Sequence, residues 1–294
     1  MARPSGTRGR RGPRCRRMSS ARSPSHIVAA GQRQLNRFVH RLRPLVPPAG
    51  WEVLQTLQSH SRGGPLVLTP PHKRALVVAP HPDDEVLGCG GTTALLCANA
   101  REVRTLIATA GDRLPVQGLA PLDIGALRRD DALRASVALG APPPVFLGFD
   151  DGTLRAVVDD LSALISRHVA EFRPDAIYAP WLLDAHADHR ALAMAVALAS
   201  VPATTEVWGY EVWAASPANR LVDVTSMWDT KCRALGEHRV PAGVFDTAGH
   251  LALNRWRSIL GTGSGYMEAY CVLRFSAYSS LAAALRAAPP HQLA

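Results

Sequence analysis

Between residues 74 and 200, short unbroken apolar runs alternate with longer segments in which apolar residues recur at helical spacing. The runs predict strands buried on both faces of a sheet, at Ala75–Pro80, Val103–Gly111, Pro144–Phe149 and Pro174–Pro180. The other segments predict helices at Thr92–Ala100, Asp123–Gly140, Arg155–Phe172 and Asp188–Ser200. Strands and helices that alternate at this spacing form right-handed βαβ units. The pattern therefore predicts an α/β fold with a Rossmann-like parallel sheet and helices on both faces.

After residue 205 the regular alternation ends, and the pattern predicts additional C-terminal strands and helices. Glu206–Trp213 and Arg220–Val224 predict strands, and Ser226–His238 predicts a helix. Tyr266–Phe275 fits either a strand or the end of a helix. We assign residues 74–294 to one domain.

The first 73 residues do not show the alternation. Residues 1–25 are predicted to be a disordered Arg-rich tail, and residues 26–73 to contain one helix, Ile27–Val46, and a linker. Twelve of the 33 basic residues lie in residues 1–50, which contain no acid, so the rest of the chain has 21 basic and 24 acidic residues. The net charge of +9 thus belongs to this end of the chain. We interpret the tail as a solvated leader, or as an extension upstream of a start at Met18 or later, and expect no nucleic-acid partner.

The composition also excludes several classes of protein. No segment reaches the roughly 18 consecutive apolar residues of a transmembrane helix, and the longest, Ala191–Ala203, is expected to be a buried helix. No apolar h-region of a secretory signal follows the arginines. Five scattered cysteines without a CxxC spacing favour a reducing compartment. We therefore expect a cytoplasmic protein without an integral membrane segment; no pattern specifies its oligomeric state.

A cluster of polar residues follows the first predicted strand. His81, Asp83, Asp84 and Glu85 precede the stretch Gly88–Gly91, whose glycines are expected to turn tightly beneath the site. Ligands of open parallel sheets bind outside the carboxyl ends of strands, so these side chains are expected in a crevice. Three interpretations compete: a dinucleotide loop, acids that cap a helix, and a metal site. The glycines do not follow the GxGxxG spacing, and the acids would repel a pyrophosphate.

A second polar cluster follows the fourth predicted strand and favours the metal site. It offers Asp184, His186, Asp188 and His189 at the same edge of the predicted sheet. Two imidazoles and one carboxylate make a set of three ligands that leaves one position open. That arrangement is typical of catalytic rather than structural zinc.

The two clusters carry a family resemblance. "APHPDDE" and "HADH" resemble the A-x-H-P-D-D-E and H-x-D-H motifs of the PIG-L/LmbE-type zinc deacetylases, which include those of the mycothiol, glycosylphosphatidylinositol and glycopeptide-antibiotic pathways. The resemblance covers roughly Arg74 to Arg274. Weaker matches are "ATAGD", "RRDDALRASVALG" and "FLGFDDG". Asp131 stands where the family usually has Glu, and Asp150 where it usually has Arg.

The resemblance implies roles for the residues of both motifs. His81, Asp84 and His189 would bind one Zn²⁺ per chain, with other divalent ions such as iron or cobalt able to occupy the same ligands. Asp83 would be the general base that takes a proton from water.

The remaining roles concern the substrate. His186 would stabilise the oxyanion or protonate the leaving amine, and Asp188 would hold His186. Arg128 and Asp151 would contact the substrate.

The function implied is removal of an N-acyl group, an acetyl, from an amino-sugar conjugate of the N-acetylglucosaminyl type, either a small molecule or a glycolipid. Two alternatives stay open: a zinc amidase that acts on a non-sugar amide, and a metal- or sugar-binding homologue without catalysis. The loops expected to recognise the aglycone, around Arg113–Asp123 and Pro241–Gly265, carry no pattern that identifies it.

Some nearby residues have simpler interpretations. Glu85 is expected to bind backbone amides or a histidine behind the metal ligands, and Cys89 to be a buried inert thiol. Trp208, Tyr210 and Trp213 could form a platform for a sugar or could pack in the core, and the sequence does not decide between these.

A chain that begins near Ser25 should keep its fold and its turnover, because residues 1–25 carry no apolar pattern. Circular dichroism and acetate release, measured on the full-length and shortened chains, check this. A shortened chain that folds but loses turnover in solution would show that the tail takes part in function.

Overall fold

The computed structural model describes residues 66–67, 69–242 and 247–287. The chain divides into two units, Met1–Leu45 and Val46–Ala294, and every described residue belongs to the second. The predicted tail at residues 1–25 and the predicted helix Ile27–Val46 lie outside the described residues.

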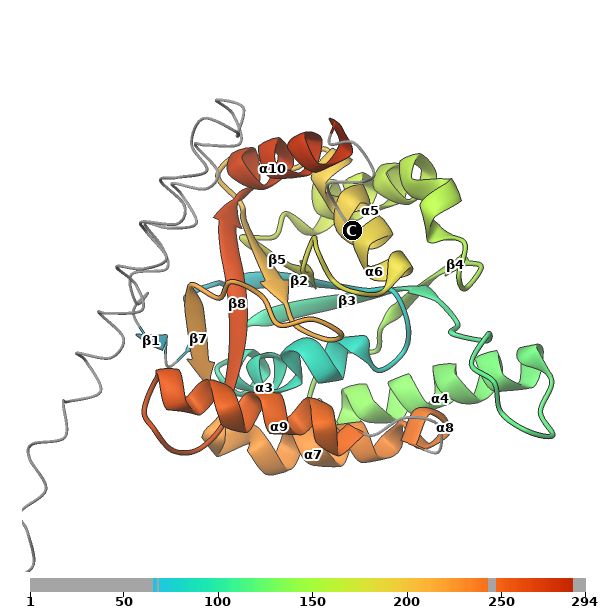
Figure 1. Ribbon diagram of the computed structural model, residues 1–294, viewed down its shortest axis with the longest axis horizontal. Helices are drawn as coiled ribbons and strands as arrows, with labels where there is room; N and C mark the ends of the chain where they lie inside the picture. Colours follow the sequence, from blue (N-terminus) through green and yellow to red (C-terminus); the bar gives the residue numbers. More distant parts are fainter. Residues whose placement is uncertain (1–65, 68, 243–246, 288–294) are drawn as a thin grey trace, which may run out of the picture. The chain divides into compact units, whose positions relative to one another are not determined.

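The strands in the described ranges form one sheet with the order β1-β7-β8-β6-β5-β2-β3-β4 (Figure 1). Their bounds are β1 Leu66–Val67, β2 Arg74–Ala79, β3 Glu102–Thr109, β4 Val145–Phe149, β5 Ala176–Pro180, β6 Glu206–Tyr210, β7 Arg220–Asp223 and β8 Met267–Arg274. Neighbouring strands pair in parallel, except that β8 runs antiparallel to β6 and β7. The predicted parallel sheet with additional C-terminal strands is confirmed.

Helices cover both faces of this sheet (Figure 1). Their bounds are α3 Asp84–Ala98, α4 Pro121–Leu139, α5 Val158–Phe172, α6 Ala187–Leu198, α7 Trp228–Glu237, α8 Arg239–Ala242, α9 Thr247–Arg257 and α10 Phe275–Ala287. Short 3₁₀ helices lie at Leu154–Val157, Thr225–Met227 and Ser258–Leu260. Within the part of the chain that the structure describes, none of the helices combines the length and apolar character needed to cross a membrane.

Strand β2 shows why the central strands are apolar throughout. Leu76 and Val78 pack into one core cluster with residues of α5, α6 and α10. Ala75 and Val77 pack into a second cluster, with residues of α3, α4 and α7. Successive side chains of a strand point to opposite faces, so a strand between two helical layers buries every residue.

The strand order determines where the two polar clusters meet. β2 pairs with β3 on one side and with β5 on the other, so the order along the sheet reverses between β2 and β5. The chain leaves both strands at their carboxyl ends beside this reversal, which is where open α/β sheets bind ligands.

Two local predictions were tested by the helices. Gly140 ends α4 in the left-handed conformation (φ 70°), as its position after the helical pattern predicted. The predicted start of a helix at Thr92 is wrong, because α3 begins at Asp84 and contains the glycines that were expected to form a turn. The helix is kinked instead at Cys89, whose φ of −145° is not helical.

Close packing explains the glycines of α3. A Cβ at Gly88 would lie 2.2 Å from Cδ2 of Tyr210, and a Cβ at Gly91 would lie 2.6 Å from Cβ of Val224. Both neighbours are completely buried. The glycines therefore let α3 approach β6 and the segment after β7 more closely than alanine would allow.

Replacement of Gly88 by alanine should lower the free energy of unfolding by about 1–3 kcal/mol, because the added methyl group overlaps the buried Tyr210 ring. Gly236→Ala is the matched control, since Gly236 lies in α7 with no atom within 4 Å of its would-be Cβ. That change should leave stability equal or raise it by up to about 1 kcal/mol. Urea denaturation of both variants measures the difference, and equal effects would contradict the packing explanation.

Candidate active site

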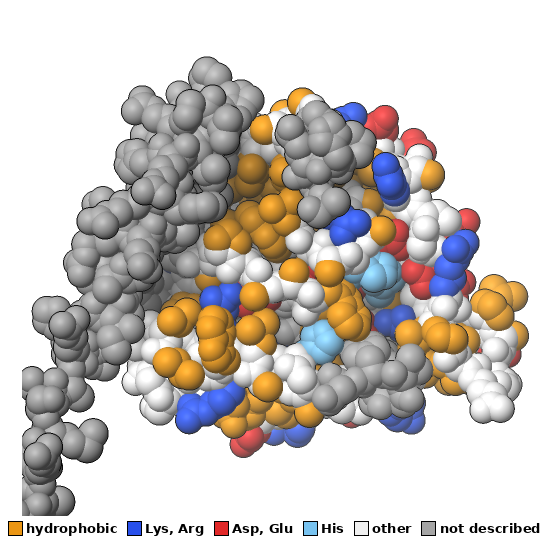
Figure 2. Space-filling model, viewed as in Figure 1, with side chains coloured by type: hydrophobic (Ala, Val, Ile, Leu, Met, Phe, Trp, Pro, Cys, Tyr) orange, Lys and Arg blue, Asp and Glu red, His pale blue; other side chains and the backbone are white. Residues whose placement is uncertain are grey.

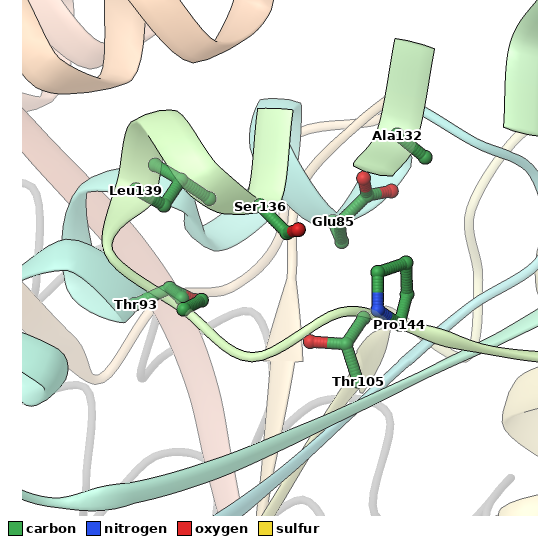
Figure 3. A pocket seen from close by; sticks show the side chains of 8 residues that line it. Glu85, Thr93, Thr105, Ala132, Ser136, Leu139 and Pro144 are labelled. Atoms are coloured by element: carbon green, nitrogen blue, oxygen red, sulfur yellow. The ribbon is translucent and has the colours of Figure 1, made fainter. Parts of the chain in front are cut away.

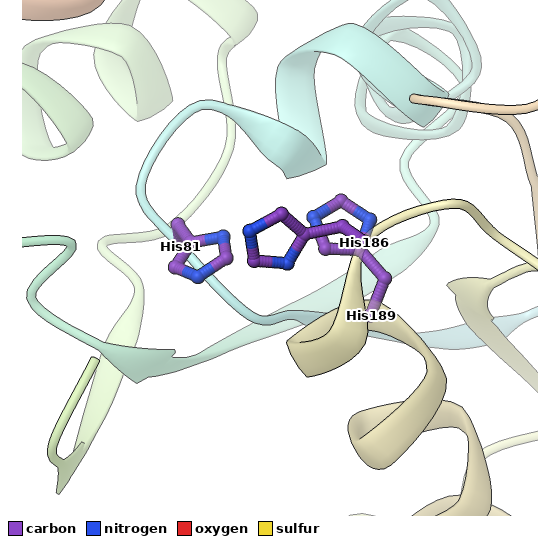
Figure 4. A group of neighbouring side chains, drawn as sticks. All are labelled: His81, His186 and His189. Carbon is purple, nitrogen blue, oxygen red and sulfur yellow. The ribbon is translucent and has the colours of Figure 1, made fainter. Parts of the chain in front are cut away.

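The two polar clusters come together at the carboxyl edge of the sheet. His81 follows β2 by two residues, whereas His186 and His189 lie at the start of α6, after β5. Figure 4 shows the three imidazoles directed toward one another. One nitrogen from each ring lies within 4.8 Å of the others. The rings are 4.9 to 5.5 Å apart between centroids. Three imidazoles from two loops therefore converge on one point.

Asp84 lies between two of these imidazoles. Its Oδ2 is 3.0 Å from Nδ1 of His81 and 3.2 Å from Nε2 of His189. Burial opposes ionisation of this carboxyl, but the two imidazoles outweigh it and hold the pKa of Asp84 well below its usual value. Burial also lowers the pKa of His189, whereas the carboxylates of Asp84 and Asp184 raise it, to about 9 overall. One carboxylate thus contacts both predicted histidine ligands.

His189 provides the test of whether these residues fit a metal. The side chain is completely buried. Neither ring nitrogen has a hydrogen bond of acceptable geometry among the described residues, although Nε2 is 3.2 Å from Asp84 and Nδ1 is 3.4 Å from Asp184. Nδ1 thus faces the carboxylate of Asp184, and Nε2 lies beside Asp84, which is itself an expected ligand. A buried imidazole with a carboxylate behind it is typical of a metal ligand. The donor set of imidazoles and a carboxylate suits zinc.

Asp184 has a supporting role that the sequence did not reveal. Its Oδ1 accepts a hydrogen bond from the backbone N–H of His186 (2.9 Å), and its Oδ2 accepts one from that of Trp213 (3.1 Å). It therefore connects the loop after β5 with the loop after β6, behind His189. Its place in the second cluster was the one available signal.

A second group of possible ligands lies on the other side of His81. Its Nε2 is 3.1 Å from Oδ1 of Asp151 and 3.4 Å from Oδ2 of Asp188. These three residues also have ligand atoms within 4.8 Å of one another. Despite its burial, the three surrounding carboxylates (Asp151, Asp188 and Asp84) raise the pKa of His81 well above its usual value.

Asp83 is separated from this arrangement although it is the neighbour of Asp84. Its backbone φ of 124° is in the region that favours glycine, a strain of about 1–3 kcal/mol. Its N–H donates to Oε2 of Glu85 (3.0 Å), and its Oδ1 accepts from Nη2 of Arg128 (3.1 Å). Burial raises the pKa of Asp83 to about 7, against the opposing effect of Arg128. The adjacent aspartates therefore have different partners and different proton affinities.

Arg128, which is predicted to contact the substrate, is held by several hydrogen bonds within the protein. It is 4% exposed and donates to the carbonyl oxygens of Gly111 (2.8 Å) and Pro82 (2.6 Å), as well as to Asp83. Gly111 has a φ of 62°, and a Cβ there would lie 2.2 Å from Nη1 of Arg128. In this structure the guanidinium therefore holds both the carbonyl that precedes the strained Asp83 and the carboxylate of Asp83 itself.

Glu85 and Cys89 lie as the sequence predicted. Glu85 binds the backbone amide of Asp83 and lies 3.7 Å from Nε2 of the buried His238. Burial raises the pKa of the Glu85 carboxyl to about 8. Its side chain lies beside a small cavity (Figure 3), which is also lined by Thr93, Thr105, Ala132, Ser136, Leu139, Ala141 and Pro144. Cys89 is buried, which raises the pKa of its thiol well above the usual value.

The central part of the chain matches a known family. Residues 76–200, which include both polar clusters, match the family model described as PIG-L, GlcNAc-PI de-N-acetylase. These matched residues, 76–200, are called the PIG-L domain after the family model. No curated protein sequence matches the chain.

Solved structures share the fold of the PIG-L domain. An N,N'-diacetylchitobiose deacetylase from Pyrococcus horikoshii is 23% identical, with a TM-score of 0.59 over 70% of this chain and 85% of that chain. A 4-carboxy-2-hydroxymuconate hydratase from Pseudomonas putida KT2440 is 21% identical, with a TM-score of 0.58 over 68% and 96%. A teicoplanin deacetylase in its zinc-inhibited form is 19% identical, with a TM-score of 0.56 over 68% and 98%. At these identities the likeness establishes the fold, and the fold supports more than one reaction.

The H-x-D-H motif of the PIG-L domain has an internal contact between Asp188 and His186, the residue that Asp188 was expected to hold. The backbone N–H of Asp188 donates to Nδ1 of His186 (3.2 Å), because His186 caps the start of α6. The carboxylate accepts from the N–H of Gly152 (2.7 Å) and lies near His81. Asp151, expected at the substrate, likewise lies against His81 and accepts from the N–H of Arg113 (3.0 Å).

The aromatic residues after the PIG-L domain separate into core and surface. Trp208 and Tyr210 are buried, and the Tyr210 hydroxyl donates to the carbonyl of Val78 (2.9 Å), so a sugar platform formed by these two is wrong. Trp213 is 43% exposed, and its ring lies 4.9 Å from that of His250. Figure 2 shows histidine side chains at the surface of the molecule, bordered by hydrophobic ones.

His189→Ala should lose the metal, because His189 would supply one of the three ligands, together with His81 and Asp84. Asp151→Asn is the matched control on the other side of His81 and should keep about one ion per chain. Metal content of both purified variants, measured by mass spectrometry, distinguishes the two groups. Loss of the ion from the Asp151 variant, with full occupancy in the His189 variant, would instead place the metal between His81, Asp151 and Asp188.

Proposed function

We propose that this chain is a metal-dependent hydrolase that removes an N-acyl group, an acetyl, from an amino-sugar conjugate of the N-acetylglucosaminyl type. The observation that carries the proposal is the division of labour between adjacent acids. Asp84 lies between two imidazoles, whereas Asp83 is buried beside it with a pKa raised to about 7. A hydrolase needs one carboxylate for the metal and one free to accept a proton.

The comparisons support the substrate class. The matching family model is described by de-N-acetylation of GlcNAc-PI, and two of the structural neighbours are deacetylases of diacetylchitobiose and teicoplanin. We extend this class to the present chain as an N-acyl amino sugar on a small-molecule or glycolipid conjugate. We place the reaction in the cytoplasm, on the cysteine pattern described above.

His81, Asp84 and His189 would hold one divalent ion, and the imidazole and carboxylate donors favour zinc. When bound, the ion supplies a Lewis acid that polarises a carbonyl and makes water a stronger acid. Asp83 accepts the proton that the attacking water loses as its oxygen bonds to the amide carbon. Arg128 keeps the Asp83 carboxylate in a fixed direction. The same proton then passes to the amide nitrogen as its bond to carbon breaks, so Asp83 is regenerated.

His186 is suited to bind the developing oxyanion. The N–H of Asp188 occupies Nδ1 of His186, so a neutral imidazole carries its proton on Nε2. Burial, together with the nearby His81 and His189, lowers the pKa of His186 and favours that neutral form. A neutral Nε2–H donates a hydrogen bond to an oxyanion but has no spare proton for the amine. Of the two expected roles, we therefore assign the first to His186.

Acetate release tests the reaction class. The purified chain is offered N-acetylglucosamine conjugates, N-acetylated amino acids and an unsaturated hydroxy acid, each with and without a chelator. Acetate from the sugar conjugates alone, abolished by the chelator, supports the proposal. Acetate from the amino acids would indicate a non-sugar amidase. Hydration of the unsaturated acid would indicate a hydratase, the activity named for the Pseudomonas putida neighbour. No turnover of any compound would indicate a binding protein.

Two isosteric substitutions separate the roles of the adjacent aspartates. Asp83→Asn should keep its fold and metal but lose about 10²–10⁴-fold in kcat, because an amide cannot act as a base. Asp84→Asn should bind metal more weakly, and excess zinc should recover part of its activity. Metal content and kcat of both variants decide the matter, and the reverse result would exchange the two assignments.

A further inference from the structure

An ion pair from the C-terminal elements inserts into the helix that begins at Asp84. In a continuous α-helix the N–H of Gly91 pairs with the carbonyl of Leu87. Here the N–H of Gly91 donates to Oε1 of Glu268 (2.8 Å), and the carbonyl of Leu87 accepts from Nζ of Lys231 (2.8 Å). Nζ of Lys231 and Oε1 of Glu268 are themselves 2.6 Å apart. The pair therefore engages both partners of one helical hydrogen bond, beside the kink of α3.

Each charge in this pair is fully satisfied. Lys231 and Glu268 are both 0% exposed. Besides Leu87 and Glu268, Lys231 donates to Oδ1 of Asn254 (3.1 Å), which completes its three N–H groups. Oε2 of Glu268 accepts from the N–H of Thr92 (2.8 Å) and from the hydroxyl of Tyr270 (2.9 Å). Lys231 lies in α7, Asn254 in α9, and Glu268 and Tyr270 in β8, all beyond residues 76–200 of the PIG-L domain.

The pair divides α3 into two segments with separate ends. Glu268 caps the second segment, because its carboxylate accepts from the N–H groups of Gly91 and Thr92 at a positive helix start. Lys231 places a positive charge at the carbonyl of Leu87, where the first turn ends and the helix dipole is negative. That first turn begins at Asp84 and follows the strained Asp83.

We propose that Lys231 and Glu268 are positioning residues for the active site. They fix the direction of the first turn of α3, and with it the carboxylate of Asp84 between the two histidines and that of Asp83 beside Arg128. Stability alone gives little reason to bury the pair, since two apolar residues of similar volume often serve as well. The effect of the pair on catalysis rests on the proposed function. Its effect on the geometry of the Asp84 site holds whatever the substrate is.

A second buried ion pair in the same molecule provides a matched control. Arg257 and Glu211 are 5% and 8% exposed, and Nε of Arg257 is 3.1 Å from Oε2 of Glu211. Ser216 completes the network through its N–H and carbonyl groups. This pair connects α9 with the segment after β6, and its hydrogen bonds among the described residues do not include α3. Disruption of either pair should lower stability, whereas only one pair supports the first turn of α3.

The test compares Lys231→Met/Glu268→Leu with Arg257→Met/Glu211→Leu in the full chain. Affinity for Co²⁺, measured by competition with a chelator, and the visible spectrum of bound Co²⁺ report ligand geometry without turnover. The first double variant should bind Co²⁺ roughly 10–100-fold more weakly, the range expected when groups behind metal ligands are removed. Its spectrum should change and its kcat should fall while KM stays constant. The second should keep wild-type affinity and spectrum even if its Tm falls.

The single variant Glu268→Gln covers the case in which the double variant does not fold. Glutamine keeps one oxygen for Gly91 or Thr92, so this variant should retain the fold and show a smaller loss of Co²⁺ affinity. Wild-type affinity and spectrum in the folded Lys231 and Glu268 variants would overturn the positioning role, even if the deacetylase activity is confirmed. Equal losses in the Arg257 and Glu211 variant would overturn it as well. A selective loss of affinity supports it even if the substrate proves to be another amide.

Discussion

Strands β2 and β5 lie side by side and run in the same direction, with Ala75 opposite Ala176 and Val77 opposite Tyr178. Because the pairing is parallel, both chains leave the sheet at one edge. Because the strand order reverses there, no crossover helix fills the space between them. His81 from one loop and His189 from the other meet at that point. The position of the site thus depends on backbone pairing of apolar strands that contribute no ligand themselves.

Burial of charge is the second constraint. Asp83, Asp84 and Glu85 are consecutive acids, each less than a tenth exposed. Each is accommodated in a different way: Asp84 by two imidazoles, Asp83 by the Arg128 guanidinium, and Glu85 by a pKa raised to about 8, which favours its neutral form. Three like charges in one buried turn would be prohibitive, and these separate solutions keep the local charge low.

The features that could be predicted from the sequence are those set by neighbouring residues. The run Ala75–Pro80 is apolar because both faces of β2 are covered, and Gly140 marks the end of α4 because it adopts φ 70° there. The meeting of the two motifs also followed from strand polarity.

The features that could not be predicted depend on residues far apart in the chain. Glu268, which shapes α3, lies 177 residues after Gly91, so the local glycine pattern suggested a turn instead. No local signal shows that Arg128 donates to the carbonyl oxygens of Gly111 and Pro82, which lie 17 and 46 residues away in the chain. Trp208 and Tyr210 could not be assigned to core or surface, because their burial depends on whether β6 is an inner strand of the sheet. It is one because β8 pairs with it, with Tyr270 opposite Tyr210.

The origin of the Lys231–Glu268 pair has a consequence for how the site is assembled. Both recognisable motifs are complete by His189, but the groups that cap the two segments of α3 come from α7 and β8. During synthesis, the motif helix emerges long before its capping side chains, and a contact between residues so distant forms slowly. A nascent chain that already contains every expected ligand would therefore lack the kink of α3, which sets the direction of the Asp83 and Asp84 carboxylates. The chain would therefore bind the metal only after β8 has joined the sheet, and not as soon as both motifs have been synthesised.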